Sequence, residues 1–114
     1  MQPVIDWTAE FPAAITVCDR DGIILYLNQQ ACRAFAKYGG GALVGRSLMD
    51  CHPGESKAKL RRLLRHPRVN AYTIEKRGKK KLIYQAPWHQ AGAYQGLVEL
   101  AIELPERLRH VVRQ

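Results

Sequence analysis

The side chains with the most distinctive chemistry are Cys51 and His52, which stand directly before Pro53. A thiol or an imidazole can bind a metal or a haem iron, and a proline fixes the backbone and stops a helix that reaches it. Haem binding through His52 or Cys51 is therefore one interpretation of this segment. The other is structural, with Cys51 as a small buried apolar group and His52 hydrogen-bonded near the start of the next helix.

The side chains that could bind a metal are scattered along the chain. A protein metal site needs three or four convergent donors, and no metal-motif spacing relates the available ones. These are Cys18, Cys32, Cys51, His52, His66, His89 and His110. An odd number of cysteines without paired spacing is typical of a reducing compartment rather than of a disulfide scaffold. We expect no metal site and a cytoplasmic location, with a haem cofactor left open.

Catalytic patterns are sparse. The sequence has no Ser-His-Asp grouping at a recognisable elbow, no phosphate-binding glycine loop and no pair of carboxylates near a histidine. Residues 39–41 are glycines, but no Lys-Ser or Lys-Thr follows them, so they predict a flexible loop. We expect the protein not to be an enzyme.

The charge is strongly basic, with 18 Lys and Arg against 10 Asp and Glu and a net charge of +8. Such a balance favours an anionic partner without selecting one. Most of the basic residues form two clusters, which are Lys57, Lys59, Arg61, Arg62, Arg65 and Arg68, and then Lys76, Arg77, Lys79, Lys80 and Lys81. Solvated surfaces explain both clusters, and non-specific binding of nucleic acid is the alternative. The absence of any run of ~18 apolar residues predicts no membrane span.

Length and pattern indicate one α+β domain with an antiparallel sheet. Strands are predicted at 13–19 and 23–27, with turn residues between them, and Asn28 is the predicted N-cap of the next helix. Beyond it, the pattern predicts helices at 29–37, 47–50 and 55–65 and strands at 70–76, 81–89 and 94–104. We expect an N-terminal cap segment at 1–11 with a short helix, a main domain at 12–105, and a basic helical tail at 106–114.

This order of elements resembles the PAS domain. The segments that carry the resemblance are 11–22, 24–28, 44–48 and 94–96, within a span of residues 11–104. The Cys-His-Pro segment is similar to bacterial PAS domains that stand alone or follow hemerythrin-like domains. The resemblance implies a five-stranded antiparallel sheet in the order 2-1-5-4-3, with short helices on one face and a cavity between. It also implies sensing of a small ligand and transmission to a partner or output domain.

Alternation along the strands and helices suggests which side chains form the wall of that cavity. The expected residues are Ile15, Val17, Phe35, Leu48, Cys51, His52, Leu60, Leu63, Tyr72, Tyr84 and Trp88. In the expected mechanism, a small ligand favours one packing of the helices and so shifts a conformational equilibrium. The rival interpretation is an interaction module with a filled cavity, in which Val4, Trp7 and Phe11 anchor a homodimer.

Overall fold

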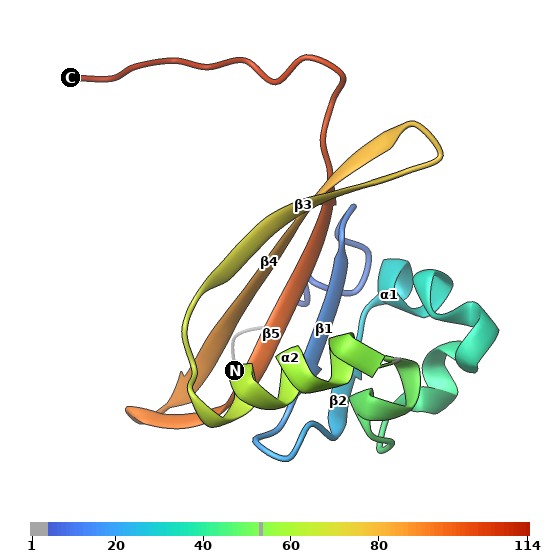
Figure 1. Cartoon of the computed structure of the whole chain (residues 1–114). Helices are drawn as coiled ribbons and strands as arrows, with labels where there is room; N and C mark the ends of the chain where they lie inside the picture. The colour runs from blue at the N-terminus through green and yellow to red at the C-terminus, as the bar shows by residue number, and fades with distance from the viewer. Residues whose placement is uncertain (1–4, 53) are drawn as a thin grey trace.

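The computed structural model describes residues 5–52 and 54–114, and Figure 1 shows how they are arranged. In chain order the strands are β1 (Ala14–Cys18), β2 (Ile24–Leu27), β3 (Asn70–Lys76), β4 (Lys79–Gln90) and β5 (Ala93–Glu103). The α-helices are α1 (Gln29–Ala34) and α2 (Gly54–Arg65), and short 3-10 turns lie between them at η1 (Ala36–Tyr38), η2 (Gly40–Leu43) and η3 (Leu48–Cys51).

The strands form one antiparallel sheet in the order β2-β1-β5-β4-β3. The helices and 3-10 turns lie on one face of this sheet (Figure 1). The expected α+β fold class and strand order are therefore confirmed.

The connections explain how this sheet closes. Asn28 is the N-cap of α1, as predicted, because its side chain accepts a hydrogen bond from the Ala31 backbone N–H. The β3–β4 and β4–β5 connections are two-residue turns with positive φ at both positions, at residues 77–78 and 91–92. Such tight turns match the twist of the strands that they join. They allow β4 to run longer at both ends than the sequence predicted.

Both ends of the chain differ from the prediction. Residues 5–13 contain no helix, because the Asp6 carboxylate accepts hydrogen bonds from the Thr8 backbone N–H (3.1 Å) and hydroxyl (2.6 Å) and holds a turn. Residues 104–114 are not helical either, and Figure 1 shows them leaving the sheet as an extended segment. A basic segment of this length has too few packing partners to sustain a helix alone.

The hydrophobic core lies between the sheet and the helices. Its buried members are Cys18, Ile24, Leu27, Ala31, Leu43, Leu48, Cys51, Leu60, Leu63, Leu64 and Leu97. Burial raises the pKa of the Cys18 thiol to about 11, and burial also raises the pKa of Cys51. Both thiols are therefore protonated at neutral pH and act as apolar core groups rather than as nucleophiles.

Among the described residues, no helix combines the length and apolar character that crossing a bilayer would need.

Candidate ligand cavity

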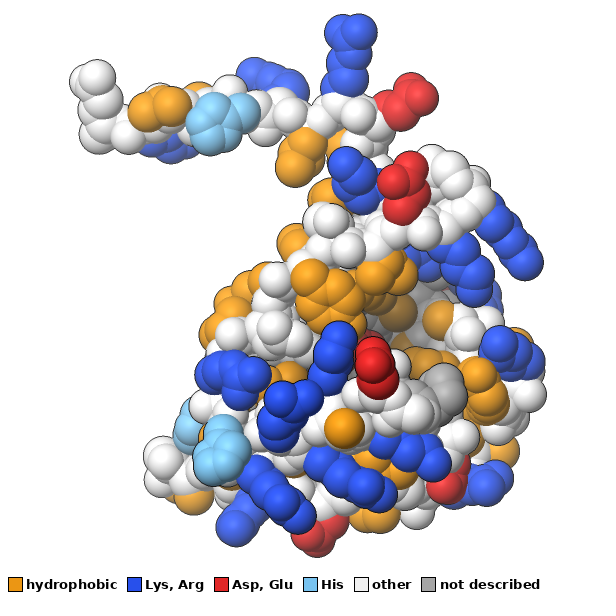
Figure 2. All heavy atoms as spheres, in the orientation of Figure 1, with side chains coloured by type: hydrophobic (Ala, Val, Ile, Leu, Met, Phe, Trp, Pro, Cys, Tyr) orange, Lys and Arg blue, Asp and Glu red, His pale blue; other side chains and the backbone are white. Residues whose placement is uncertain are grey.

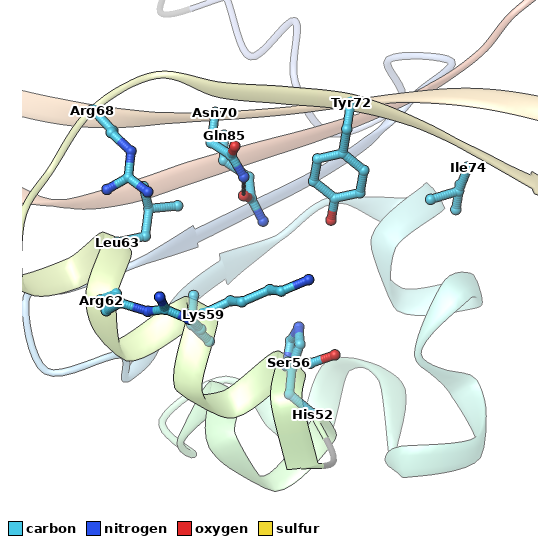
Figure 3. Close-up of a pocket in the computed structure, with 11 residues that line it drawn as sticks. His52, Ser56, Lys59, Arg62, Leu63, Arg68, Asn70, Tyr72, Ile74 and Gln85 are labelled. Carbon is cyan, nitrogen blue, oxygen red and sulfur yellow. Dashed lines mark hydrogen bonds between the residues drawn. The ribbon is translucent and has the colours of Figure 1, made fainter.

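A cavity of about 630 Å³ lies between α2 and β3. Figure 3 shows that side chains of the sheet point across it toward α2, while Lys59 extends into it from the helix. Its walls are formed by His52, Ser56, Lys59, Leu60, Arg62, Leu63, Arg68, Asn70, Tyr72, Ile74 and Gln85. A volume of this size is in the range of small-molecule sites.

Two periodicities bring these residues together. On α2, Ser56, Lys59 and Leu63 are spaced at i, i+3 and i+7, so they share one face of the helix. On β3, every second residue from Asn70 to Ile74 points to the same side of the sheet. The polar stripe of α2, which lies beside its buried leucines, thus faces the edge strand β3. The space between this helix and this strand stays open.

An amide ladder forms the sheet side of the cavity. Asn70 Nδ2 donates to Gln85 Oε1, and Gln85 Nε2 donates to Glu99 Oε1, each at 2.8 Å. These bonds cross from β3 to β4 to β5 and fix the orientation of both amides. The sequence prediction missed Asn70 and Gln85 because it searched for apolar wall residues. Asn70 lies two residues before Tyr72 on β3, which was the signal available in the sequence, whereas its pairing with Gln85 is seen only in the β3–β4 register.

His52 enters the cavity from the end of η3. Its Nδ1 lies 2.7 Å from the Leu48 carbonyl oxygen, and a carbonyl can only accept, so Nδ1 carries the proton. Nε2 is then the ring nitrogen left for a molecule in the cavity. Of the residues predicted to line the cavity, His52, Leu60, Leu63 and Tyr72 do so. That a ligand binds them stays a prediction.

The space under the centre of the sheet is almost closed. It measures about 20 Å³ and is bounded by side chains that include Thr16, Leu48 and Leu97. A volume of that order holds about one water molecule. Leu48 and Cys51 therefore belong to the packed core, and Phe35 packs against this core from the α1 side. The cavity at the β3 edge, by contrast, has room for a larger ligand.

The assignment of Ile15 and Val17 to the cavity is wrong. Thr16 and Cys18 border the space beneath the helices, so Ile15 and Val17 point to the opposite face of the sheet. A shift of one residue in such an assignment exchanges the two faces of a strand. Here both faces of β1 are buried enough that apolar character does not distinguish them, because Ile15 is 4% exposed and Cys18 is 1% exposed.

Tyr84 and Trp88 were also expected in the cavity wall, but they point to the opposite face of the sheet. Gln85 points into the cavity, so its neighbour Tyr84 points away from it. Trp88 pairs with Gly96, and its Nε1 donates to the Cys18 carbonyl at 3.0 Å. The indole therefore ties β4 to β1 across the strand between them.

Haem does not fit this cavity. His52 offers one axial donor, but most wall residues are polar or charged, and Asn70 and Gln85 would lose water without gaining a partner on a porphyrin face. Within residues 5–52 and 54–114, no group of three or more His, Cys, Asp or Glu side chains is placed to hold a metal ion.

A comparison with protein families finds one that matches this chain. The family described as the PAS fold matches residues 8–67, which is more than half of the chain. A comparison with curated proteins gave no match.

Solved structures with similar folds include domains of signalling proteins. A C-terminal domain from Streptococcus mutans is 25% identical, with a TM-score of 0.65 over 83% of this chain and 78% of that one. The Aer2 receptor from Vibrio cholerae, described as a dual PAS-haem oxygen sensor, is 19% identical, with a TM-score of 0.61 over 82% and 95%. A sensory box sensor histidine kinase from Vibrio cholerae is 15% identical, with a TM-score of 0.61 over 84% and 85%.

Proposed function

This chain belongs to the PAS family, and from that premise we propose that it is a non-catalytic sensory module that binds a small polar ligand between α2 and β3. PAS domains are sensory domains that are common in signalling proteins. The observation that carries the proposal is the open cavity of about 630 Å³, in contrast to the nearly filled space of about 20 Å³ beneath the central strands.

A ligand in this cavity contacts two elements at once. It touches the polar stripe of α2 and the inner side of β3, so it favours the packing of α2 that brings both walls within reach. The end of α2 is tied to the sheet, because the Tyr94 hydroxyl donates to the Leu64 carbonyl at 2.9 Å. A change in the position of α2 therefore passes into β5, and from its end to a partner or output domain.

The free thiols support a proposal for the compartment. Cys18, Cys32 and Cys51 are all free, and two of them are buried in the core. Such cysteines suit a reducing environment, so we place the module in the cytoplasm. Its kinship with bacterial PAS domains that carry a Cys-His-Pro segment remains a prediction.

Melting temperatures measured with a panel of metabolites test the proposal. The panel holds amino acids, sugars, polyamines, carboxylates, phosphates and haem, and one class should raise the melting temperature. A ligand at a hundredfold excess over its Kd stabilises by about 2.7 kcal/mol, which is a shift of roughly 10 °C for a domain of this size.

A matched pair of variants ties that shift to the cavity. Ser56→Trp places an indole in the wall, whereas Ala58→Trp places one on the same helix outside it. The shift should vanish in the first variant and persist in the second. Equal shifts in both variants, or stabilisation by haem alone, would contradict this cavity as the ligand site.

A second candidate function is dimerisation, favoured by the exposed aromatic pair of the N-terminal segment. Trp7 and Phe11 meet edge to face with their ring centroids 5.4 Å apart, yet Trp7 is 62% exposed. Val4, the third predicted anchor, lies outside the described residues. Light scattering should show a homodimer that Trp7→Ser dissociates, and a monomeric wild-type protein would rule this function out.

A further inference from the structure

We infer that the ligand is a small anion with at least two negative charges, held by Lys59, Arg62 and Arg68. The inference rests on the proposed function, because it names the chemical class that the same cavity selects. The shared chemistry is that of phosphate or carboxylate groups, which accept paired hydrogen bonds from guanidinium donors.

The three cations converge on one space without a balancing charge. Lys59 and Arg62 are one turn apart on α2, and Arg68 follows that helix at the entry to β3. The ion pairs of the described residues lie elsewhere, at Arg46–Asp50 and Lys79–Glu103. The residues outside the description, 1–4 and 53, contain no Asp or Glu. Like charges gathered in this way repel one another, and a multivalent anion removes the repulsion.

The neighbouring carboxylates lie outside the cavity wall. Glu55, in the first turn of α2, and Glu75, on β3, form no part of the cavity wall. Glu99 lies behind the wall, where its carboxylate accepts the hydrogen bond of Gln85. Figure 2 shows Lys and Arg side chains gathered over the α2 side of the molecule. The charged side chains in the cavity wall itself are therefore all cationic.

The opposite wall offers donors that suit an anion. Burial raises the pKa of the Tyr72 phenol, and the Glu99 carboxylate raises it further, so the hydroxyl stays protonated and can donate. Each amide of the ladder uses one N–H in the ladder and keeps a second one. A ligand between the walls thus meets cations on one side and neutral donors on the other.

Titration calorimetry with pyrophosphate and with citrate tests this inference and separates the phosphate source from the carboxylate source. Arg62→Gln and Arg68→Gln each remove a cation from the wall, and Arg61→Gln and Arg65→Gln each remove one from positions outside it. All four arginines are exposed, so the variants keep the fold. We expect at least one probe to bind, each wall variant to weaken it by about tenfold or more, and each control to weaken it by less than about twofold.

The other outcomes overturn the inference in distinguishable ways. Equal weakening in wall and control variants would show general attraction to a basic surface. Binding of a short single-stranded oligonucleotide but of neither small anion would assign the cations to nucleic acid. A neutral or cationic metabolite whose binding is blocked by Ser56→Trp would keep the proposed function and refute the anion. No binding of any metabolite would refute both.

Discussion

Replacing Gly96 by alanine is expected to destabilise the protein by at least about 4 kcal/mol, a large part of the stability of a small domain. A Cβ at this position would lie 2.0 Å from the Cys18 carbonyl oxygen and 2.7 Å from the Asp19 carbonyl carbon. Both are backbone atoms, so no side chain can move aside. The φ of +152° is also one that other residues rarely adopt.

The position of Gly96 explains why nothing larger fits. It is the β5 residue that pairs with Trp88 of β4, and the Trp88 indole reaches over the strand to the Cys18 carbonyl on β1. Removing the close approach of β5 to β1 would break this bond and open the centre of the sheet.

Urea denaturation followed by circular dichroism measures the effect. Gly45→Ala is the matched control, because Gly45 also has a positive φ (+92°) but has no neighbour within 4 Å of an added Cβ. That control should lose only the conformational term of about 1–2 kcal/mol. Equal losses in the two variants would show that the contact with β1 is not the cause.

Replacing Asn28 by leucine is expected to destabilise the protein by about 3–5 kcal/mol, since it leaves several buried backbone groups without a partner. Asn28 is 1% exposed. Its Oδ1 accepts from the backbone N–H groups of Ile15 (2.9 Å) and Ala31 (3.0 Å). Its Nδ2 donates to the carbonyls of Thr8 (2.9 Å) and Ala13 (2.8 Å). One side chain thus joins the N-terminal segment, β1 and α1.

The substitution Asn28→Asp separates shape from hydrogen bonding. The second carboxylate oxygen would face two carbonyl oxygens, so the variant should be about as unstable as Asn28→Leu at neutral pH. Burial and this repulsion raise the pKa of the introduced carboxyl in the folded state. Part of the stability should therefore return as the pH falls through that raised pKa, because the protonated carboxyl can donate again.

Thermal unfolding across pH measures this recovery, with Gln29→Leu as the control at the exposed neighbouring position. A stability of Asn28→Asp that stays flat or falls further on acidification, relative to wild type, would contradict the hydrogen-bonding role assigned to Asn28.

The sequence predicted the bounds of helices and strands better than it predicted which side chains point toward the helices. Glycine turns and alternating strands placed β3 at its observed bounds and α2 within one residue of them. Apolar character does not reveal the orientation of β1, because residues on both of its faces are buried. Ile15 and Val17 are the larger apolar groups, yet Thr16 and Cys18 face the helices. Only the pairing of β1 with β5 decides the orientation, and that pairing joins residues far apart in the chain.

The cavity was harder to predict for a different reason. A search for apolar wall residues found Leu60, Leu63 and Tyr72 but missed Asn70, Gln85 and the cations opposite them. The basic cluster of α2 has a spacing that equally suits a solvated face. Its helical spacing cannot show that one stripe of it faces a strand edge, since this depends on where α2 packs. The Asn70–Gln85 pairing depends likewise on the β3–β4 register.

The most direct test of the ligand cavity is a titration of the isotope-labelled protein with pyrophosphate and citrate, followed by amide NMR spectra. We predict saturable shifts concentrated on α2 and on Arg68, Asn70, Tyr72 and Gln85, with changes at the Tyr94 contact as α2 moves. Shifts confined to the basic turn between β3 and β4, or spread evenly over the charged surface, would contradict the assignment of this cavity as the site that the protein uses to sense its ligand.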